Sequence, residues 1–248
     1  MSGAYKTIRQ PIPRPYEARS SERMSQTVTA MCKATSWDAY QVDIKNTIHH
    51  QNRVALLSFE IATRLGLPDQ ARSTLYYAAQ YHDIGKLQLA PSTLFKRGDL
   101  SPQEFESVKQ HASNSYEILS RAKGLAHATS VALIARQHHE RLDGSGYPFG
   151  LTESRITQEA KILAVADVYD ALTNERCYKG AMGNERALAI LENGIGSKFD
   201  STVFHALEEV IALSMAPRLQ PLFPLLPSRT SAPSGLYVAN TNRSLVFH

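Results

Sequence analysis

The feature that most constrains the fold of this chain is the helical spacing of its apolar residues. Val54, Leu57, Ile61 and Leu65 recur at steps of three and four residues, and Gly66 follows where such a helix would end. The same spacing continues in four later stretches, residues 125–137, 157–172, 184–192 and 201–213. Alternating apolar and polar residues, which are typical of strands, are absent over any useful length. We therefore expect an all-α bundle with short loops.

One helix start and one loop are marked by their own residues. Ser101-Pro102-Gln103-Glu104 combine an N-cap serine, a proline at the first helical position and the glutamate of a capping box. Residues 143–148 are rich in glycine and end in proline, which is typical of a loop. We expect a helix from residue 102 and an irregular segment around residues 143–148.

Two proline-rich tails flank the helical region. Residues 1–36 hold three prolines within five positions, and residues 214–248 hold five more. Proline interrupts helices because it lacks a backbone N–H and its ring clashes with the preceding turn. We therefore expect a flexible basic arm over residues 1–36, a helical domain over residues 37–213 and a proline-rich tail over residues 214–248.

The positive charge of the chain lies in its tails. The net charge is +4 overall, but residues 1–36 carry six Lys or Arg against two Glu, and residues 214–248 carry three Arg and no acid. The remaining residues hold 18 basic and 21 acidic side chains. Binding to a long nucleic acid needs a concentration of positive charge that the helical region lacks, so we do not expect such a partner.

Three further observations favour a cytoplasmic protein. No apolar run reaches the roughly 18 residues that a membrane span needs. The basic residues near the start are not followed by the hydrophobic stretch of a secretory signal. The only two cysteines, Cys32 and Cys177, are far apart, which argues against a disulfide framework and a cysteine-based zinc site.

Histidine and aspartate side chains are the candidates for chemistry. His82-Asp83 and His138-His139 each close a predicted helix, His111 lies in the helix after Ser101, and Asp167 lies among aliphatic residues. A buried aspartate is costly unless it is paired or bound to a metal. Imidazoles and carboxylates together suit Fe, Mn, Zn or similar ions better than Ca or Mg. Two such ions about 3.5–4 Å apart can deprotonate a bridging water and hold phosphoryl oxygens for in-line attack.

The combination matters more than any single pair, because a lone His-Asp or His-His pair in a helix is usually structural. Here the pairs lie in longer motifs. His82-Asp83-Ile84-Gly85-Lys86 resembles the HD-x-G-K signature of HD-domain phosphohydrolases, and residues 138–148, HHERLDGSGYP, resemble the HHE-x-x-DG-x-GYP signature of the HD-GYP subfamily. Further likeness to that subfamily lies in residues 50–54, 94–100, 166–172, 176–178 and 196–200.

The resemblance implies an HD-domain-like helical bundle with an extended C-terminal helical part of the HD-GYP type. It implies a phosphodiesterase that hydrolyses cyclic di-GMP to linear pGpG or GMP with two divalent transition-metal ions. Iron or manganese is the first expectation for these ions, with zinc, nickel or cobalt as alternatives. By position the implied metal ligands, with Asp83 bridging the ions, are His50, His82, Asp83, His111, His138, His139 and Asp167.

The resemblance also implies roles in substrate binding. Lys86 would contact the scissile phosphate or the leaving oxygen, and Arg176 and Lys179 would hold substrate phosphates. Gly146, Tyr147 and Pro148 would shape the mouth of the site. The same loop could contact diguanylate cyclase (GGDEF) domains.

Two positions depart from the family pattern. Members with three metals carry a glutamate one helical turn before the first histidine, where this chain has Asn46, so we expect two ions rather than three. Ser115 replaces a glycine in the helix that carries His111, which predicts a local change in packing.

Two other functions stay open. An HD-type hydrolase of another cyclic dinucleotide, such as cyclic GMP-AMP, would carry the same motifs, because the residues that read the bases lie outside them. A regulatory module that has lost catalysis and binds GGDEF proteins is the alternative from a different class. Loss of catalysis is usually accompanied by loss of ligands, whereas every implied ligand of a two-metal site is present.

Overall fold

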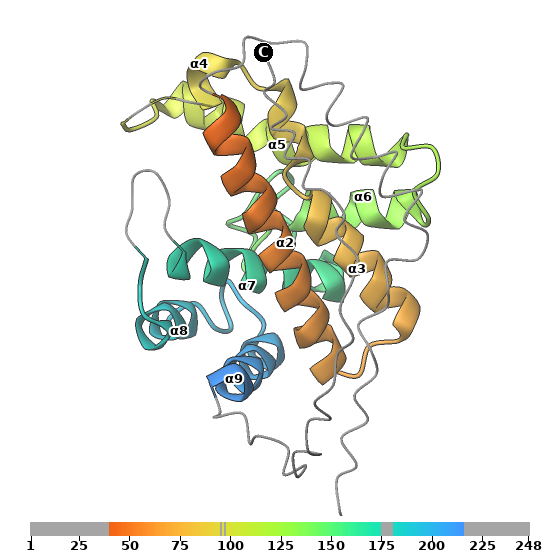
Figure 1. The fold of residues 1–248 in the computed structure, drawn as a ribbon, viewed down its shortest axis with the longest axis vertical. Coiled ribbons are helices and arrows are strands. Elements are labelled where there is room, and N and C mark those ends of the chain that lie inside the picture. The colour runs from red at the N-terminus through yellow and green to blue at the C-terminus, as the bar shows by residue number, and fades with distance from the viewer. Residues whose placement is uncertain (1–39, 95, 97, 175–180, 216–248) are drawn as a thin grey trace, which may run out of the picture. The chain divides into compact units, whose positions relative to one another are not determined.

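The computed structural model describes residues 40–94, 96, 98–174 and 181–215, with side chains from residue 48 onwards. Within these residues the chain is helical and contains no strand, which confirms the all-α prediction (Figure 1). The α-helices are α2 (Tyr40–Arg64), α3 (Asp69–Tyr81), α4 (Pro91–Leu94), α5 (Pro102–Ser120), α6 (Ala128–Gln137), α7 (Gln158–Thr173), α8 (Asn184–Glu192) and α9 (Ser201–Met215). Two 3₁₀ helices, η1 (Ile84–Gln88) and η2 (Glu153–Arg155), interrupt the loops.

The helix ends follow the local signals in the sequence. Ser101 and Glu104 form the predicted capping box, with the Ser101 Oγ accepting from the Glu104 amide and the Glu104 carboxylate accepting from the Ser101 amide. Gly66 follows α2 with a φ of +71°, the left-handed conformation that glycine adopts without strain. Helix α6 begins at Ala128, three residues later than predicted, because His127 has a left-handed φ of 54°.

Helix α7 forms the centre of the bundle. Nine of its sixteen residues are buried, on all sides of the helix, and it contacts α2, α3, α6, α8 and α9. A helix that is apolar all round is stable in water only when other elements cover each of its faces. Figure 1 shows α5 and α6 on one side of α7 and the C-terminal helices α8 and α9 on the other. No helix among the described residues is long and apolar enough to cross a membrane.

A close approach between η1 and α5 places the HD motif. A Cβ atom on Gly85 would overlap the backbone of His111 and Ser115, so only glycine allows this contact. The hydroxyl of Ser115 fills the contact: it donates to the His82 carbonyl at 2.6 Å and accepts from the Gly85 amide at 2.9 Å. Ser115, which departs from the family pattern, therefore joins α5 to the HD motif through two buried hydrogen bonds.

Candidate metal centre

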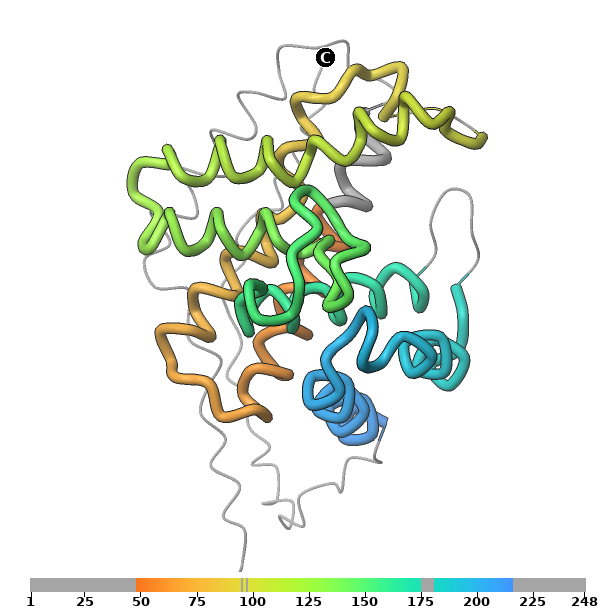
Figure 2. Tube along the Cα trace, turned by 180° about the vertical axis from the view of Figure 1, so that it is seen from behind, coloured from red at the N-terminus to blue at the C-terminus, as the bar shows by residue number. Residues whose placement is uncertain are grey.

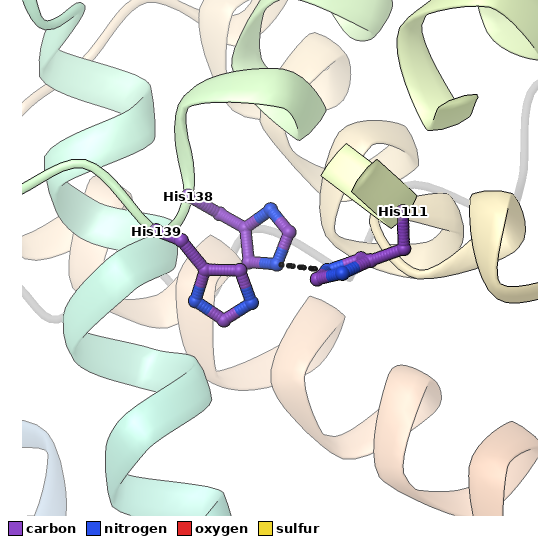
Figure 3. Close-up of side chains that lie close together, drawn as sticks. All are labelled: His111, His138 and His139. Atoms are coloured by element: carbon purple, nitrogen blue, oxygen red, sulfur yellow. Dashed lines mark hydrogen bonds between the residues drawn. The ribbon is translucent and has the colours of Figure 1, made fainter. Parts of the chain in front are cut away.

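Five segments of the chain bring their histidines and aspartates to one place. His50 lies on α2, His82 and Asp83 follow α3, His111 lies on α5, His138 and His139 follow α6, and Asp167 lies on α7. Three sets have ligand atoms within 4.8 Å of one another: His111, His138 and His139; His50, His82 and Asp167; and His82, Asp83 and His138. Figure 3 shows the rings of the first set facing a common space. The structure thus brings together all seven predicted ligands.

Asp83 lies between two of these sets. Its Oδ1 is 3.3 Å from the Nε2 atom of His111, in the three-histidine set. Its Oδ2 is 3.4 Å from the Nε2 atom of His82, in the set that contains Asp167. One carboxylate therefore faces both sets, which is the arrangement expected of a ligand shared by two ions.

Backbone carbonyls orient three of the imidazoles. The Nδ1 atoms of His82, His111 and His138 lie 2.7, 2.7 and 2.5 Å from the carbonyl oxygens three residues earlier in the chain. A carbonyl only accepts hydrogen bonds, so each Nδ1 carries the proton and each neutral ring keeps its Nε2 lone pair for a ligand. The Nε2 atoms of these rings are the atoms that face the cluster.

Unsatisfied buried atoms show that the cluster fits metal ions. The Nε2 of His82 and the Oδ1 of Asp83 are buried and make no hydrogen bond with any residue that the structure describes. An unpaired buried polar atom commonly costs about 1–3 kcal/mol. Both atoms belong to the set of His82, Asp83 and His138, where a divalent ion would satisfy them. The donor set of imidazole nitrogens and carboxylate oxygens fits transition metals.

Burial and neighbouring charges keep most of the imidazoles ready to bind metal. Burial lowers the pKa of His111 and His138, and it lowers the pKa of His139 to about 3, so all three are neutral at pH 7. Burial alone would raise the pKa of Asp83, but the charge of Lys86 beside it holds that pKa well below its usual range. His111, His138 and His139 therefore offer neutral nitrogens and Asp83 offers a charged carboxylate, the forms that bind metal ions.

Among the residues that the structure describes, the glycine-rich loop and Lys86 lie next to the cluster. The ring of Tyr147 lies against the ring of His139, with centroids 4.6 Å apart, and the peptide bond between Tyr147 and Pro148 is cis. A Cβ atom on Gly146 would overlap the backbone of residues 139–141, so glycine is required there. The Nζ atom of Lys86 lies 2.6 Å from Oδ2 of Asp83. Arg176 and Lys179 lie outside the described residues.

The comparison with protein families agrees with this geometry. A family model described as HD domain matches residues 14–203, which is more than half of the chain. The chain belongs to the HD-domain family.

The relatives confirm the resemblance to HD-GYP proteins. Over 174 residues the chain is 38% identical to a 3'3'-cGAMP-specific phosphodiesterase 3 of Vibrio cholerae, a match that covers 69% of this chain and 37% of the relative. Over 160 residues it is 40% identical to a cyclic di-GMP phosphodiesterase of Thermotoga maritima, with 64% and 43% covered. This HD-domain chain therefore matches less than half the length of these relatives.

A solved structure supports the fold. An HDG"Y"P protein from Bdellovibrio bacteriovorus superposes with a TM-score of 0.56, over 78% of this chain and 60% of the other, at 24% sequence identity. At that identity the likeness concerns the fold of the HD domain.

Glu140, the third residue of the HHE motif, has a structural role that we did not predict. Its carboxylate accepts hydrogen bonds from the amides of Phe149 and Leu151, both at 2.8 Å, and its side chain is buried. It therefore holds the loop that carries Tyr147 in a closed turn, which Figure 2 shows in front of α7. The signal in the sequence was a glutamate next to a glycine-rich loop, but the amides that donate to it lie nine and eleven residues away.

Replacing Glu140 with alanine is expected to lower the free energy of unfolding by about 2–5 kcal/mol, because the buried amide of Leu151 and the partly buried amide of Phe149 lose a charged acceptor. Glu140→Gln keeps a carbonyl oxygen and should cost less. Denaturant titration of the three proteins tests this. An unchanged midpoint for Glu140→Ala would show that the loop is held by other contacts.

Asp170 and Arg53 also lie beside the cluster, and the sequence predicted no role for either side chain. Asp170 lies one helical turn after Asp167, and its Oδ2 is 2.7 Å from the Nδ1 of His50. Arg53 lies three residues after His50 and donates to both oxygens of Asp170, at 2.7 and 2.9 Å. The spacing of three residues on both helices was the available signal, but only packing shows that the two helices face each other.

Proposed function

We propose that this chain is a metal-dependent phosphodiesterase that hydrolyses cyclic di-GMP. The observation that carries the proposal is the convergence of seven histidine and aspartate side chains, with Asp83 facing both the three-histidine set and the set that contains Asp167. Relatives named as cyclic di-GMP and 3'3'-cGAMP phosphodiesterases support the class of substrate. Residues 37–213 would form the catalytic unit.

Two divalent transition-metal ions fit the ligand sets. His50, His82 and Asp167 would hold one ion, His111, His138 and His139 the other, and Asp83 would bind both. Iron or manganese is our first proposal for their identity, with zinc, nickel or cobalt as alternatives. Such ions, when bound, supply Lewis acidity for the phosphodiester and lower the pKa of water.

The side chains around the ligands would place the substrate. Lys86, held 2.6 Å from Asp83, lies beside the shared carboxylate and would stabilise negative charge on the scissile phosphate or the leaving oxygen. Tyr147, packed on His139, would form one wall of the site together with Gly146 and Pro148. We propose phosphate contacts for Arg176 and Lys179.

Cyclic GMP-AMP is a second candidate substrate, because a relative of 38% identity is named a 3'3'-cGAMP-specific phosphodiesterase. Both substrates present the same phosphodiester to the metals, so the choice depends on residues that contact the bases. We also propose a GGDEF protein as a partner for the loop around Tyr147. The ligand sets favour catalysis over a purely regulatory module.

The test is metal analysis together with hydrolysis of defined substrates. The purified chain is expected to hold two ions, to cut cyclic di-GMP to pGpG or GMP, and to lose this activity on chelation. Cyclic GMP-AMP, assayed in parallel, distinguishes the two substrates. A metal-free protein with full activity would contradict the proposal. A metal-loaded protein that cuts neither substrate would leave only the regulatory alternative, and a third fully occupied ion would contradict the expected pair.

A further inference from the structure

Asp170 is a heavily hydrogen-bonded carboxylate next to the proposed metal ligands. Besides the contacts with His50 and Arg53 described above, its Oδ1 accepts from the side-chain amide of Asn174 at 3.0 Å. It is only 4% exposed. Four hydrogen bonds from three side chains therefore fix the carboxylate, and one of them ends on the ring of a proposed ligand.

This contact sets His50 apart from three of the other imidazoles. The Nδ1 atoms of His82, His111 and His138 face uncharged backbone carbonyls, whereas that of His50 faces a carboxylate. A carboxylate behind a ligating imidazole fixes the ring and its tautomer and makes the far nitrogen a stronger donor to the metal. Arg53 keeps the Asp170 carboxylate in place through a two-point contact.

The two ligand sets consequently differ in charge. The set of His50, His82 and Asp167 contains one carboxylate, and its His50 is backed by a second, Asp170, whose charge Arg53 offsets. The set of His111, His138 and His139 contains three imidazoles and no carboxylate. The Asp83 carboxylate belongs to neither set but faces both, with its oxygens 3.4 Å from His82 and 3.3 Å from His111. A divalent cation is held more tightly where more negative charge surrounds it.

We infer that Asp170, clamped by Arg53, is a positioning residue that makes the ion at His50, His82 and Asp167 the more tightly held of the two. The inference rests on the metal site of the proposed function, but it concerns retention of metal and needs no substrate. In this inference the Arg53 guanidinium keeps the Asp170 carboxylate oriented toward His50.

Graded chelation of the metal-loaded full chain tests this inference. The protein is dialysed against increasing concentrations of EDTA, and the ions per chain are measured by mass spectrometry. The unaltered chain is expected to lose its ions in two steps. In Asp170→Asn the second step should shift to a chelator concentration about 10–100-fold lower, the usual effect of losing a partner of a ligating histidine.

Asp200→Asn is the matched control. Asp200 is also a largely buried carboxylate that is paired with a cation, Lys161 at 3.1 Å, but it belongs to none of the ligand sets. Its replacement should lower the thermal stability and leave both release steps unchanged. If Asp170→Asn does not fold, Arg53→Gln replaces it in the test, because Arg53 is 43% exposed and can be substituted without opening the core. In Arg53→Gln the second release step should shift to a chelator concentration about tenfold lower.

The outcomes separate positioning from general support of the fold. A single release step in the unaltered chain, or an unmoved second step in folded Asp170→Asn, would overturn the inference. Equal shifts of both steps in Asp170→Asn and Asp200→Asn would reduce Asp170 to a stability residue, which also overturns it. A chain that releases metal as expected but cuts no cyclic dinucleotide would contradict the proposed substrate and leave this inference standing.

Discussion

Asp83→Ala is expected to lose both metal ions and nearly all hydrolysis of cyclic dinucleotides. The carboxylate faces both ligand sets, so its removal takes a charged ligand from each ion at once. Loss of a residue that only supports a ligand costs about 10–100-fold in metal affinity, and a shared ligand should cost more than that. Metal analysis after dialysis, together with product formation from cyclic di-GMP, measures both effects.

The fold is expected to survive this change. Lys86, the partner of Asp83, is 33% exposed and can turn to solvent, so no buried charge is left unpaired. Asp83→Asn, which keeps the shape but removes the charge, should show nearly the same loss of metal. Two retained ions in folded Asp83→Ala would show that the carboxylate is not shared between them.

Lys86→Ala is expected to lower kcat by about 10²–10³-fold, the usual effect of removing one group that stabilises charge in the transition state. KM should change little, since the substrate phosphates would still meet the ions. Arg176→Ala and Lys179→Ala should instead raise KM, as expected of contacts made equally in the ground and transition states. Steady-state kinetics on proteins of equal metal content separates the two patterns.

Lys96→Ala is the control for Lys86→Ala. Lys96 also pairs with a carboxylate at 2.6 Å and is 35% exposed, but its partner is Glu104 in the capping box of α5. Its replacement should leave kcat unchanged. A kcat for Lys86→Ala within about twofold of the unaltered chain, far short of the 10²–10³-fold loss, would remove Lys86 from the chemistry.

Local signals were enough to predict the helical class and the candidate ligands. The capping box at Ser101 and the glycine after α2 depend on contacts within a few residues, so their sequence patterns carry over directly into structure. His82-Asp83 and His138-His139 could be chosen from their residue types within two signature motifs, whereas the full set of seven ligands, including His50, is what the resemblance to the HD-GYP subfamily implies. The roles of Arg176 and Lys179, and the boundaries at residues 37 and 213, remain predictions.

Packing between distant helices decided the rest. His50 and Asp170 are 120 residues apart, and their contact exists only because α2 packs on α7. Helical spacing shows which side of a helix is apolar, but it does not identify the helix that will cover that side. For the same reason the sequence could name Asp83 as a ligand, while only the tertiary structure placed its two oxygens toward different ligand sets.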